Sequence, residues 1–440
     1  MSDNANSYPK MLIVSNNSLS NNDNNGKTIL SFFKDYPSER LAQLYLRNEE
    51  YKCDKRIAHI NISEISILRA IIPLSSEIND FNMNPNNEIK HLNYDSKYRK
   101  LALDNLSRLQ ISRIIREAIW LTGLWNTNKL RRWLKQIAPE RIFFLAGDSI
   151  FAYKIVEFIK NEYNIPVTLF ITDDYVLSHR FFGVFQGLRK IIIRQKLEQA
   201  IYNCSNYITI SEKMRRAYFQ RFRKNSLVSM YNIDSHHICR ISPNKSSVRS
   251  NRIMLIYVGG LQLGRDKTIY KVINAIEDIN CTNNRNVILN IYSKAFPINK
   301  AIIGKMSWEY KGILHNEKDV IEELTRADVL LFIETFSKKY RPRIEYSLST
   351  KVPEYLSVGK PIFAVGPKYS GSMQYLDDCA YCCYCNDQAQ IKESLQRMLF
   401  DDELRDKLEI RALQKYKDCY CNNDTDKRVL NSIMGKVDAN

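Results

Sequence analysis

The chain has 440 residues, of which 44% are hydrophobic and 11% aromatic, so it can bury about two cores of ordinary domain size. No stretch approaches the roughly 20 consecutive apolar residues that a membrane-spanning helix requires. Residues 1–10 are polar and lack the apolar segment of a signal peptide. We therefore expect a cytoplasmic protein.

The charge balance is strongly basic. Lysine and arginine number 65 against 48 aspartates and glutamates, which gives a formal net charge of +17. An excess of this size favours polyanionic partners, namely nucleic acid, an anionic membrane face or phosphorylated small molecules. Charge alone does not separate the three.

Six of the ten cysteines lie late in the sequence: Cys379, Cys382, Cys383, Cys385, Cys419 and Cys421. Without an export signal we expect free thiols rather than disulfides. Their spacing lacks the two separated C-x2-C pairs of a structural zinc site, and residues 380–385 also fit a short apolar strand. We expect no metal, with zinc on these cysteines as the open alternative.

The first half of the chain alternates between apolar runs and helical patterns. Strands are predicted over residues 11–14, 41–46, 56–62, 142–146, 167–171 and 207–210. Helices are predicted over 27–34, 106–121, 128–137, 150–163 and 185–202, and a polar loop over 75–100. This alternation indicates a parallel sheet covered on both faces.

The pattern stops over residues 236–250, which are polar and contain Pro243, and we interpret them as a linker. Strands are then predicted over 253–258, 287–292, 329–333 and 361–365, and helices over 268–279, 318–326, 351–358, 388–400 and 403–416. The sequence therefore predicts an α/β protein of two Rossmann-like domains, 1–235 and 251–400, facing across a cleft. Residues 401–440 are expected to pack back toward the N-terminal domain.

Residues 347–365 read SLSTKVPEYLSVGKPIFAV and carry the signals of a short capped helix. Ser349 and Thr350 lie in cap position, and Gly359 is expected to end the helix in a left-handed conformation. A helix N-terminus offers N–H groups and a positive dipole end to a phosphate. Glu354, about one turn in, can accept two hydroxyl hydrogen bonds, as from a ribose. The alternative is a surface helix with an ordinary cap.

Residues 257–267 read YVGGLQLGRDK and follow a predicted strand. Gly259 and Gly260 allow the backbone to approach a ligand closely. Arg265 and Lys267 supply positive charge suited to a pyrophosphate. The alternative is a loop before a helix with solvated cations.

Residues 347–365 resemble the donor-binding motif of the retaining GT-B glycosyltransferases of family 4 (glycosyl transferases group 1), roughly S-x-P-x-K-x-x-E-Y-x-A-x-G-K-P-V. The resemblance implies that Glu354 binds the donor ribose. It implies that Arg265, with Lys267, and the N–H groups from Ser349 to Lys351 hold the donor diphosphate. Many members carry a partner glutamate eight positions earlier, where this sequence has Tyr346 with Glu345 beside it.

The N-terminal half offers weaker candidates. A phosphate-binding Walker A loop is excluded, because Asn21 stands where that motif needs glycine. The resemblance instead implies that Gly26 lies in a loop beside the donor phosphates and the acceptor. Asp173 and Asp174 follow the strand 167–171, and paired carboxylates can divide acid and base roles. Their alternative is a solvated loop or helix cap.

Two stretches, Arg108–Arg141 and Arg180–Arg194, mix cations with aromatic residues that include Trp120, Trp125 and Trp133. They fit an anionic membrane surface, or two amphipathic helices that cover the core. Single-stranded nucleic acid also fits. No nucleic-acid recognition motif is present, so we do not expect that partner.

The resemblance implies a metal-independent, hexosyltransferase-type enzyme. It would move a sugar from a nucleoside-diphosphate sugar, bound by residues 251–400, to a hydroxyl of a glycan or lipid-linked glycan bound by residues 1–235. Retention of anomeric configuration is implied, as is a role in capsule, O-antigen or exopolysaccharide synthesis at the inner face of the membrane. A catalytically inactive nucleotide-sugar-binding protein and a sugar-nucleotide epimerase remain alternatives.

Overall fold

The computed structural model describes residues 7–20, 24–51, 53–64, 66–67, 110–177, 184–229, 252–283, 286–296, 304–421 and 423–436. The chain divides into two compact units. The first comprises Met1–Ser18, Pro37–Tyr51 and Lys55–Pro166, and the second comprises Leu19–Tyr36, Lys52–Asp54 and Val167–Asn440. The predicted loop 75–100 and linker 236–250 lie outside the described residues.

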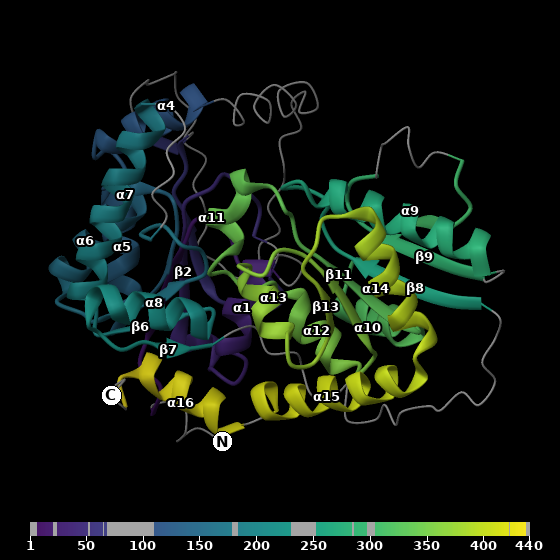
Figure 1. Ribbon diagram of the computed structural model, residues 1–440. Helices are drawn as coiled ribbons and strands as arrows, with labels where there is room; N and C mark the ends of the chain where they lie inside the picture. The colour runs from purple at the N-terminus through teal and green to yellow at the C-terminus, as the bar shows by residue number, and fades with distance from the viewer. Residues whose placement is uncertain are drawn as a thin grey trace. The chain divides into compact units, whose positions relative to one another are not determined.

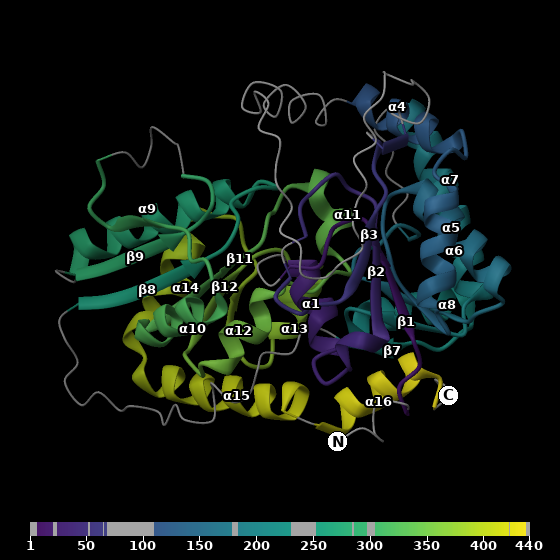
Figure 2. The same cartoon turned by 180° about the vertical axis from the view of Figure 1, so that it is seen from behind.

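One sheet has seven strands in the order β3-β2-β1-β4-β5-β6-β7. Its strands are β1 (Met11–Ser15), β2 (Leu41–Tyr45), β3 (Ala58–Asn61), β4 (Arg141–Ala146), β5 (Val167–Ile171), β6 (Asn206–Thr209) and β7 (Leu227–Val228). The strand β1 pairs in parallel with β2 and β4. The strand β2 also pairs in parallel with β3, and Figure 2 shows β1, β2 and β3 side by side. Every residue of β1, β2 and β5 is buried, which is typical of parallel strands covered on both faces.

The helices that lie between or directly after these strands in the sequence are labelled in Figure 1. They are α1 (Asn24–Phe32), α4 (Gln110–Leu121), α5 (Asn128–Ile137), α6 (Ile150–Tyr163), α7 (Val184–Asn203) and α8 (Glu212–Phe222). Local chemistry fixes their ends, since Thr127 accepts a hydrogen bond from Leu130 N at the start of α5 and the left-handed Ala138 ends it. The sequence analysis missed α8, although Ser211 caps it in the same way.

The second sheet has six strands, all paired in parallel, in the order β10-β9-β8-β11-β12-β13. They are β8 (Arg252–Val258), β9 (Asn286–Tyr292), β10 (Trp308–Gly312), β11 (Val329–Ile333), β12 (Ile362–Val365) and β13 (Tyr381–Cys383). The edge strand β10 was not predicted. The two parallel α/β sheets confirm the predicted fold class.

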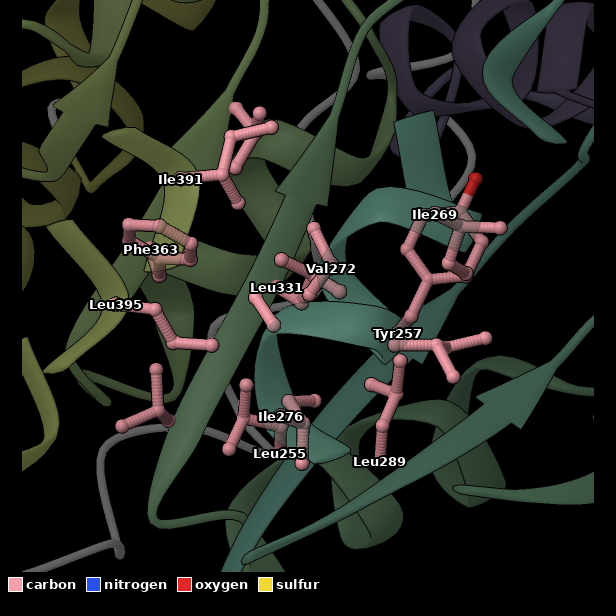
Figure 3. Close-up of a cluster of buried hydrophobic side chains, with 14 of the residues drawn as sticks. Leu255, Tyr257, Ile269, Val272, Ile276, Leu289, Leu331, Phe363, Ile391 and Leu395 are labelled. Atoms are coloured by element: carbon pink, nitrogen blue, oxygen red, sulfur yellow. The ribbon is translucent and has the colours of Figure 1, made fainter. Parts of the chain in front are cut away.

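The core of the second sheet lies under α9 (Arg265–Asn283) and α14 (Gln388–Phe400). Figure 3 shows Leu255, Leu289 and Leu331 of the strands packed against Val272 of α9 and Leu395 of α14. These side chains are fully buried, so the core fixes where the strands β8 and β11 end relative to the first turn of α9.

The remaining helices are α10 (Glu317–Arg326), α11 (Arg341–Ile344), α12 (Lys351–Ser357), α13 (Gly371–Leu376), α15 (Asp402–Tyr420) and α16 (Asn423–Met434). Helix α12 packs on α15, and α16 packs on α1. Asn206 Nδ2 of β6 donates a 2.8 Å hydrogen bond to the carbonyl of Ser432 in α16. These contacts join the C-terminal helices to elements far away in the sequence.

Gly359 follows α12 with φ +66°, which confirms the predicted left-handed end of that helix. A Cβ built on Gly359 would lie 2.3 Å from Leu413 Cγ of α15. Gly359 therefore satisfies two constraints, a backbone conformation that favours glycine and a close approach between helices.

We predict that Gly359→Ala lowers the free energy of unfolding by roughly 2–4 kcal/mol, because it adds a clash with Leu413 to the backbone strain. Gly304 is the matched control, since its φ is +84° and nothing lies within 4 Å of the added Cβ. Gly304→Ala should cost only about 1 kcal/mol. Equal losses in guanidinium unfolding curves would contradict the packing argument.

Candidate functional site

The loop after β8 brings its backbone against a lysine from α12. Gly259 has φ +148°, and its amide donates a 2.8 Å hydrogen bond to the carbonyl of Tyr292. A Cβ at Gly259 would lie 1.7 Å from Lys351 Nζ. The space beside Gly259 is therefore filled by the Lys351 ammonium group, and a larger residue at 259 would displace it.

The Lys351 ammonium lies over an aromatic ring. Its Nζ is 4.5 Å from the ring centroid of Tyr257 and donates to the Tyr257 hydroxyl at 3.2 Å. Burial, with the nearby positive charge of Arg265, lowers the pKa of Lys351 to about 7, while Glu334 and Glu354 oppose the shift. Lys351 therefore lies close to Arg265 and Glu354, in surroundings that make it lose its proton more readily than an exposed lysine does.

Arg265, at the first residue of α9, forms an ion pair with Glu334. Its Nε and Nη2 donate to Glu334 Oε1 at 3.0 and 2.6 Å. The side chains are 18% and 3% exposed, so the pair is held away from solvent. The two hydrogen bonds to Glu334 orient the Arg265 guanidinium. The sequence analysis did not identify Glu334 as a site residue.

The second carboxylate oxygen of Glu334, Oε2, is also buried, and it lacks a hydrogen-bond donor among the described residues. A buried carboxylate oxygen without a donor is unfavourable, which marks it as a candidate for a ligand hydroxyl. The sequence held one available signal, an acidic residue directly after the buried run 329–333, at the carboxyl end of a parallel strand.

Glu354 is half-buried on α12. Burial raises its pKa to about 7, and the negative charge of Glu317 acts in the same direction, while Lys27 and Lys351 lower it. Lys27 belongs to α1, which is part of the second compact unit although it lies near the N-terminus. Lys27 is close enough to Glu354, the predicted ribose-binding residue, to affect its pKa.

Two backbone N–H groups at the start of α12 already donate hydrogen bonds to serine side chains of this chain. Ser349 N donates to Ser372 Oγ at 2.9 Å, and Lys351 N reaches Ser349 Oγ at 3.4 Å. Thr350 is the N-cap residue, but its side chain makes no capping hydrogen bond. Because α12 has seven residues, the nearby cations supply more of the positive potential than the helix end does.

Two other predicted donor residues lie at the margin of this group. A Cβ at Gly260 would meet only the flexible end of the Gln262 side chain, at 2.3 Å. Lys267 is exposed on the first turn of α9 and forms no ion pair with a described residue. The structure brings together Gly259, Arg265, Lys351 and Glu354, and leaves Lys267 outside them.

Gly26 lies inside helix α1, which begins at Asn24, not in the preceding loop where the sequence analysis expected it. A Cβ at Gly26 would approach Ser20 O at 2.4 Å and Ser20 N at 2.7 Å. The absence of a side chain therefore allows α1 to pack directly on the backbone of Ser20. Its place beside donor phosphates stays a prediction.

The two aspartates after β5 have different environments. Asp174 is buried, and its Oδ1 accepts hydrogen bonds from Val176 N, Leu177 N and the Tyr218 hydroxyl at 3.0, 2.9 and 3.2 Å. Asp173 is exposed, and its Oδ1 accepts from Ser347 Oγ at 3.3 Å. Asp174 thus orders the turn after β5, whereas Asp173 is the more accessible carboxylate.

The two candidates for the missing family glutamate are both engaged. Glu345 accepts two hydrogen bonds from Arg341, at 2.8 and 2.7 Å. The carbonyl of Tyr346 accepts from Ser211 Oγ at 2.6 Å, and Lys213 Nζ lies 5.5 Å from the Tyr346 ring centroid. Which of the two fills that role stays a prediction.

The tryptophans of the stretch 108–141 point inward. Trp120, Trp125 and Trp133 are 1%, 8% and 7% exposed. Trp120 stacks on Phe151 with centroids 4.1 Å apart and donates to Glu64 at 2.8 Å. The structure therefore assigns them to the core, and Arg108 and Arg180 lie outside the described residues.

The late cysteines form no metal cluster in the described part of the chain, where no group of three or more potential ligands is placed to hold an ion. Burial raises the pKa values of Cys379 and Cys382 to about 12, which keeps both as neutral thiols. Metal independence of the protein stays a prediction. Within the described residues, no helix has the length and apolar character needed to cross a membrane.

No protein-family model matches the sequence, and no curated protein matches it. Solved structures are similar over nearly the whole chain. HepE of Anabaena in complex with UDP is 11% identical, with a TM-score of 0.63, over 97% of this chain and 100% of HepE. HepE in complex with UDP-glucose is 12% identical, with a TM-score of 0.62, over 98% of this chain and 100% of HepE. The trehalose-6-phosphate protein of E. coli bound with UDP-2-fluoro glucose is 11% identical, with a TM-score of 0.59, over 97% of this chain and 99% of that protein.

The chain has the GT-B fold. In this GT-B fold, Gly259 follows β8 and Glu334 follows the adjacent strand β11, so both lie at the carboxyl edge of the second sheet. Open parallel sheets bind their ligands at that edge. The geometry thus places two cations and two carboxylates beside the glycine loop that follows β8.

We predict that Lys351 titrates near pH 7 and that Glu334→Gln moves its midpoint to lower pH. The reason is that Glu334 carries a negative charge that raises the pKa of Lys351. The measurement is the NMR titration of ¹³C-labelled lysines, with the Lys351 signal identified by its loss in Lys351→Met.

The matched control is Glu322→Gln, which removes an exposed glutamate of α10 that pairs with Arg326. It should leave the Lys351 midpoint unchanged. A wild-type midpoint above pH 9 would contradict the description of this site.

Proposed function

We propose that this chain is a glycosyltransferase that moves a sugar from a nucleoside-diphosphate sugar to a hydroxyl group, with retention of configuration. The observation that carries the proposal is the convergence of Arg265 and Lys351, from two separate elements, beside the side-chain-free Gly259. Two converging cations suit a diphosphate, whose negative charge increases when the sugar leaves.

Each residue of the group has a proposed role. Arg265 and Lys351 hold the diphosphate, and Glu354 accepts hydrogen bonds from the ribose hydroxyls. Glu334 orients Arg265 through its Oε1 and offers Oε2 to a hydroxyl of the bound donor. Gly259 leaves the space that the Lys351 ammonium occupies, and Ser349 and Thr350 position Lys351.

We propose a uridine nucleotide as the donor. The supporting observation is that HepE, which is similar to this chain over 97% of its length, was solved with UDP and with UDP-glucose. The choice of uridine is an analogy that rests on the shared fold.

The proposal also assigns the acceptor to the N-terminal half. Residues 1–235 are proposed to bind a glycan or lipid-linked glycan, with Gly26 and Asp173 or Asp174 near the reacting centre. The accessible carboxylate of Asp173 favours it over Asp174, whose Oδ1 orders the turn after β5. Polysaccharide assembly at an anionic membrane face fits the net charge of +17.

We predict that UDP raises the melting temperature of the wild type and that Arg265→Ala and Glu354→Ala abolish the rise. A ligand at 100 times its dissociation constant adds about 2.7 kcal/mol to the folded state, which calorimetry resolves easily. GDP, ADP, CMP and TDP serve as competing nucleotides. Lys407→Ala, an exposed lysine of α15 paired with Glu403, is the control and should respond like the wild type.

If no nucleotide stabilises the wild type, the assignment of the donor site is wrong. If UDP binds but a labelled UDP-sugar is neither hydrolysed nor transferred, the protein is a nucleotide-sugar-binding protein instead. Conversion of the donor into a different nucleotide sugar, without any acceptor, would indicate an epimerase.

We predict that the dissociation constant for UDP increases between pH 7 and pH 9. The depressed pKa of Lys351, about 7, means that its positive charge is lost across this range, while the charge of the diphosphate group changes little. The increase is up to about tenfold per pH unit, measured by isothermal titration calorimetry.

Two variants isolate the titrating group. Lys351→Met should bind weakly with a flat profile from pH 7 to pH 9, because the lysine charge is absent throughout. Glu354→Gln removes the other group with a pKa of about 7 and should keep the slope. A slope that survives in Lys351→Met would assign the pH dependence to another residue.

A further inference from the structure

Helix α7 has apolar side chains on two opposite sides. Ile193, Leu197 and Ile201 are buried in the core. Leu188, Ile191 and Ile192 are 55%, 44% and 42% exposed. A helix that covers a sheet needs one apolar stripe, so the second stripe has no role in the core of the fold.

Helix geometry separates the two stripes cleanly. At about 100° per residue, Leu188, Ile191 and Ile192 fall within an arc of about 100°, and the buried stripe lies roughly opposite. The exposed arc continues along the helix as Gln195, Gln199 and Tyr202, all exposed and none charged. We call the six residues of this arc the outer stripe of α7.

The surroundings of the outer stripe are basic. Arg189 and Lys196 lie along one flank of the helix, about 80–100° from the stripe. Residues 184–229, which run from the start of α7 to the residue after β7, contain ten lysines and arginines against two glutamates. This segment therefore carries a net +8 of the +17 of the whole chain.

We propose that the outer stripe of α7 is a membrane-binding surface for an anionic bilayer, lying in the interfacial plane. Aliphatic side chains that enter the headgroup region, flanked by arginine and lysine, are the pattern of an interfacial helix. Each cation near an anionic leaflet adds attraction that salt screens. The charge balance favours a lipid surface over a second protein, since most protein surfaces are not strongly acidic.

This inference rests on the proposed function only for its purpose, because a transferase that acts on a lipid-linked glycan must work at a bilayer. Its physical basis is independent of the donor site. Of the two stretches predicted from the sequence, the proposal keeps part of Arg180–Arg194, which contains Leu188, Ile191 and Ile192, and leaves out Arg108–Arg141, whose three tryptophans are buried.

The test is co-sedimentation of the full chain with vesicles of phosphatidylcholine alone and of phosphatidylcholine with phosphatidylglycerol. The wild type should bind the anionic vesicles, with affinity that falls as salt rises, and bind the neutral vesicles at least tenfold more weakly. Ile191→Ser combined with Ile192→Ser should lower binding to anionic vesicles by about tenfold or more. Ile410→Ser removes an isoleucine that is 68% exposed on α15 and should leave binding unchanged.

Folding and donor binding are monitored in the same samples by the UDP-induced rise in melting temperature, which the stripe variants should retain. Lost UDP binding in the wild type, with vesicle binding intact, would count against the proposed function alone. The membrane inference fails if the wild type does not bind anionic vesicles, or if the double variant binds them as well as the wild type. It also fails if sedimentation shows a dimer that the double variant dissociates, because the stripe would then join two copies of the chain.

Discussion

The buried ion pair between Arg265 and Glu334 is the contact on which the candidate site depends. Glu334 is tied by its backbone amide to the carbonyl of Val365 and accepts a hydrogen bond from Thr268 Oγ1 at its own carbonyl. It thereby joins the ends of β11 and β12 to the first turn of α9. A buried charge needs a partner, so Arg265 is held in one orientation, and its charge in turn contributes to the lowered pKa of Lys351.

The same arrangement explains why Gly259 has no side chain. Lys351 reaches back from α12 over Tyr257 into the space that a Cβ would fill. The loop after β8 and the start of α12 therefore depend on each other. A positive group of low pKa, an oriented guanidinium and a half-buried carboxylate form one electrostatic unit, in which a change at any member shifts the others.

Much of the fold could be predicted from local sequence. The strands 167–171 and 329–333 and the helices 128–137, 150–163 and 388–400 begin and end where the sequence placed them, because continuous apolar runs and capping residues mark both boundaries. The strand β10 and the helix α8 were missed for the opposite reason. β10 reads WEYKG at a sheet edge and shows no clear apolar period. α8 does bury Met214, Tyr218 and Phe222 at helical spacing, but many charges surround these three residues and make the period hard to see.

The candidate site divides in the same way. Gly259, Arg265 and Glu354 carry a recognisable local pattern. Glu334 shows only its position after a buried strand, and Lys27 joins the group through tertiary structure. The outward stripe of α7 and the inward tryptophans show a further limit. A run such as Ile191-Ile192-Ile193 reveals that a helix has apolar sides, but which side meets the core is decided by the packing of the sheet.

The distribution of tryptophans has a spectroscopic consequence. Of the four tryptophans, Trp120, Trp125 and Trp133 belong to the first compact unit and only Trp308, on the edge strand β10, belongs to the second. Intrinsic fluorescence therefore reports mainly on the surroundings of α4 and α5, far in sequence from Arg265 and Lys351. An emission change on heating describes the first unit, while the unit that contains the candidate site is followed better by circular dichroism or by the single signal of Trp308.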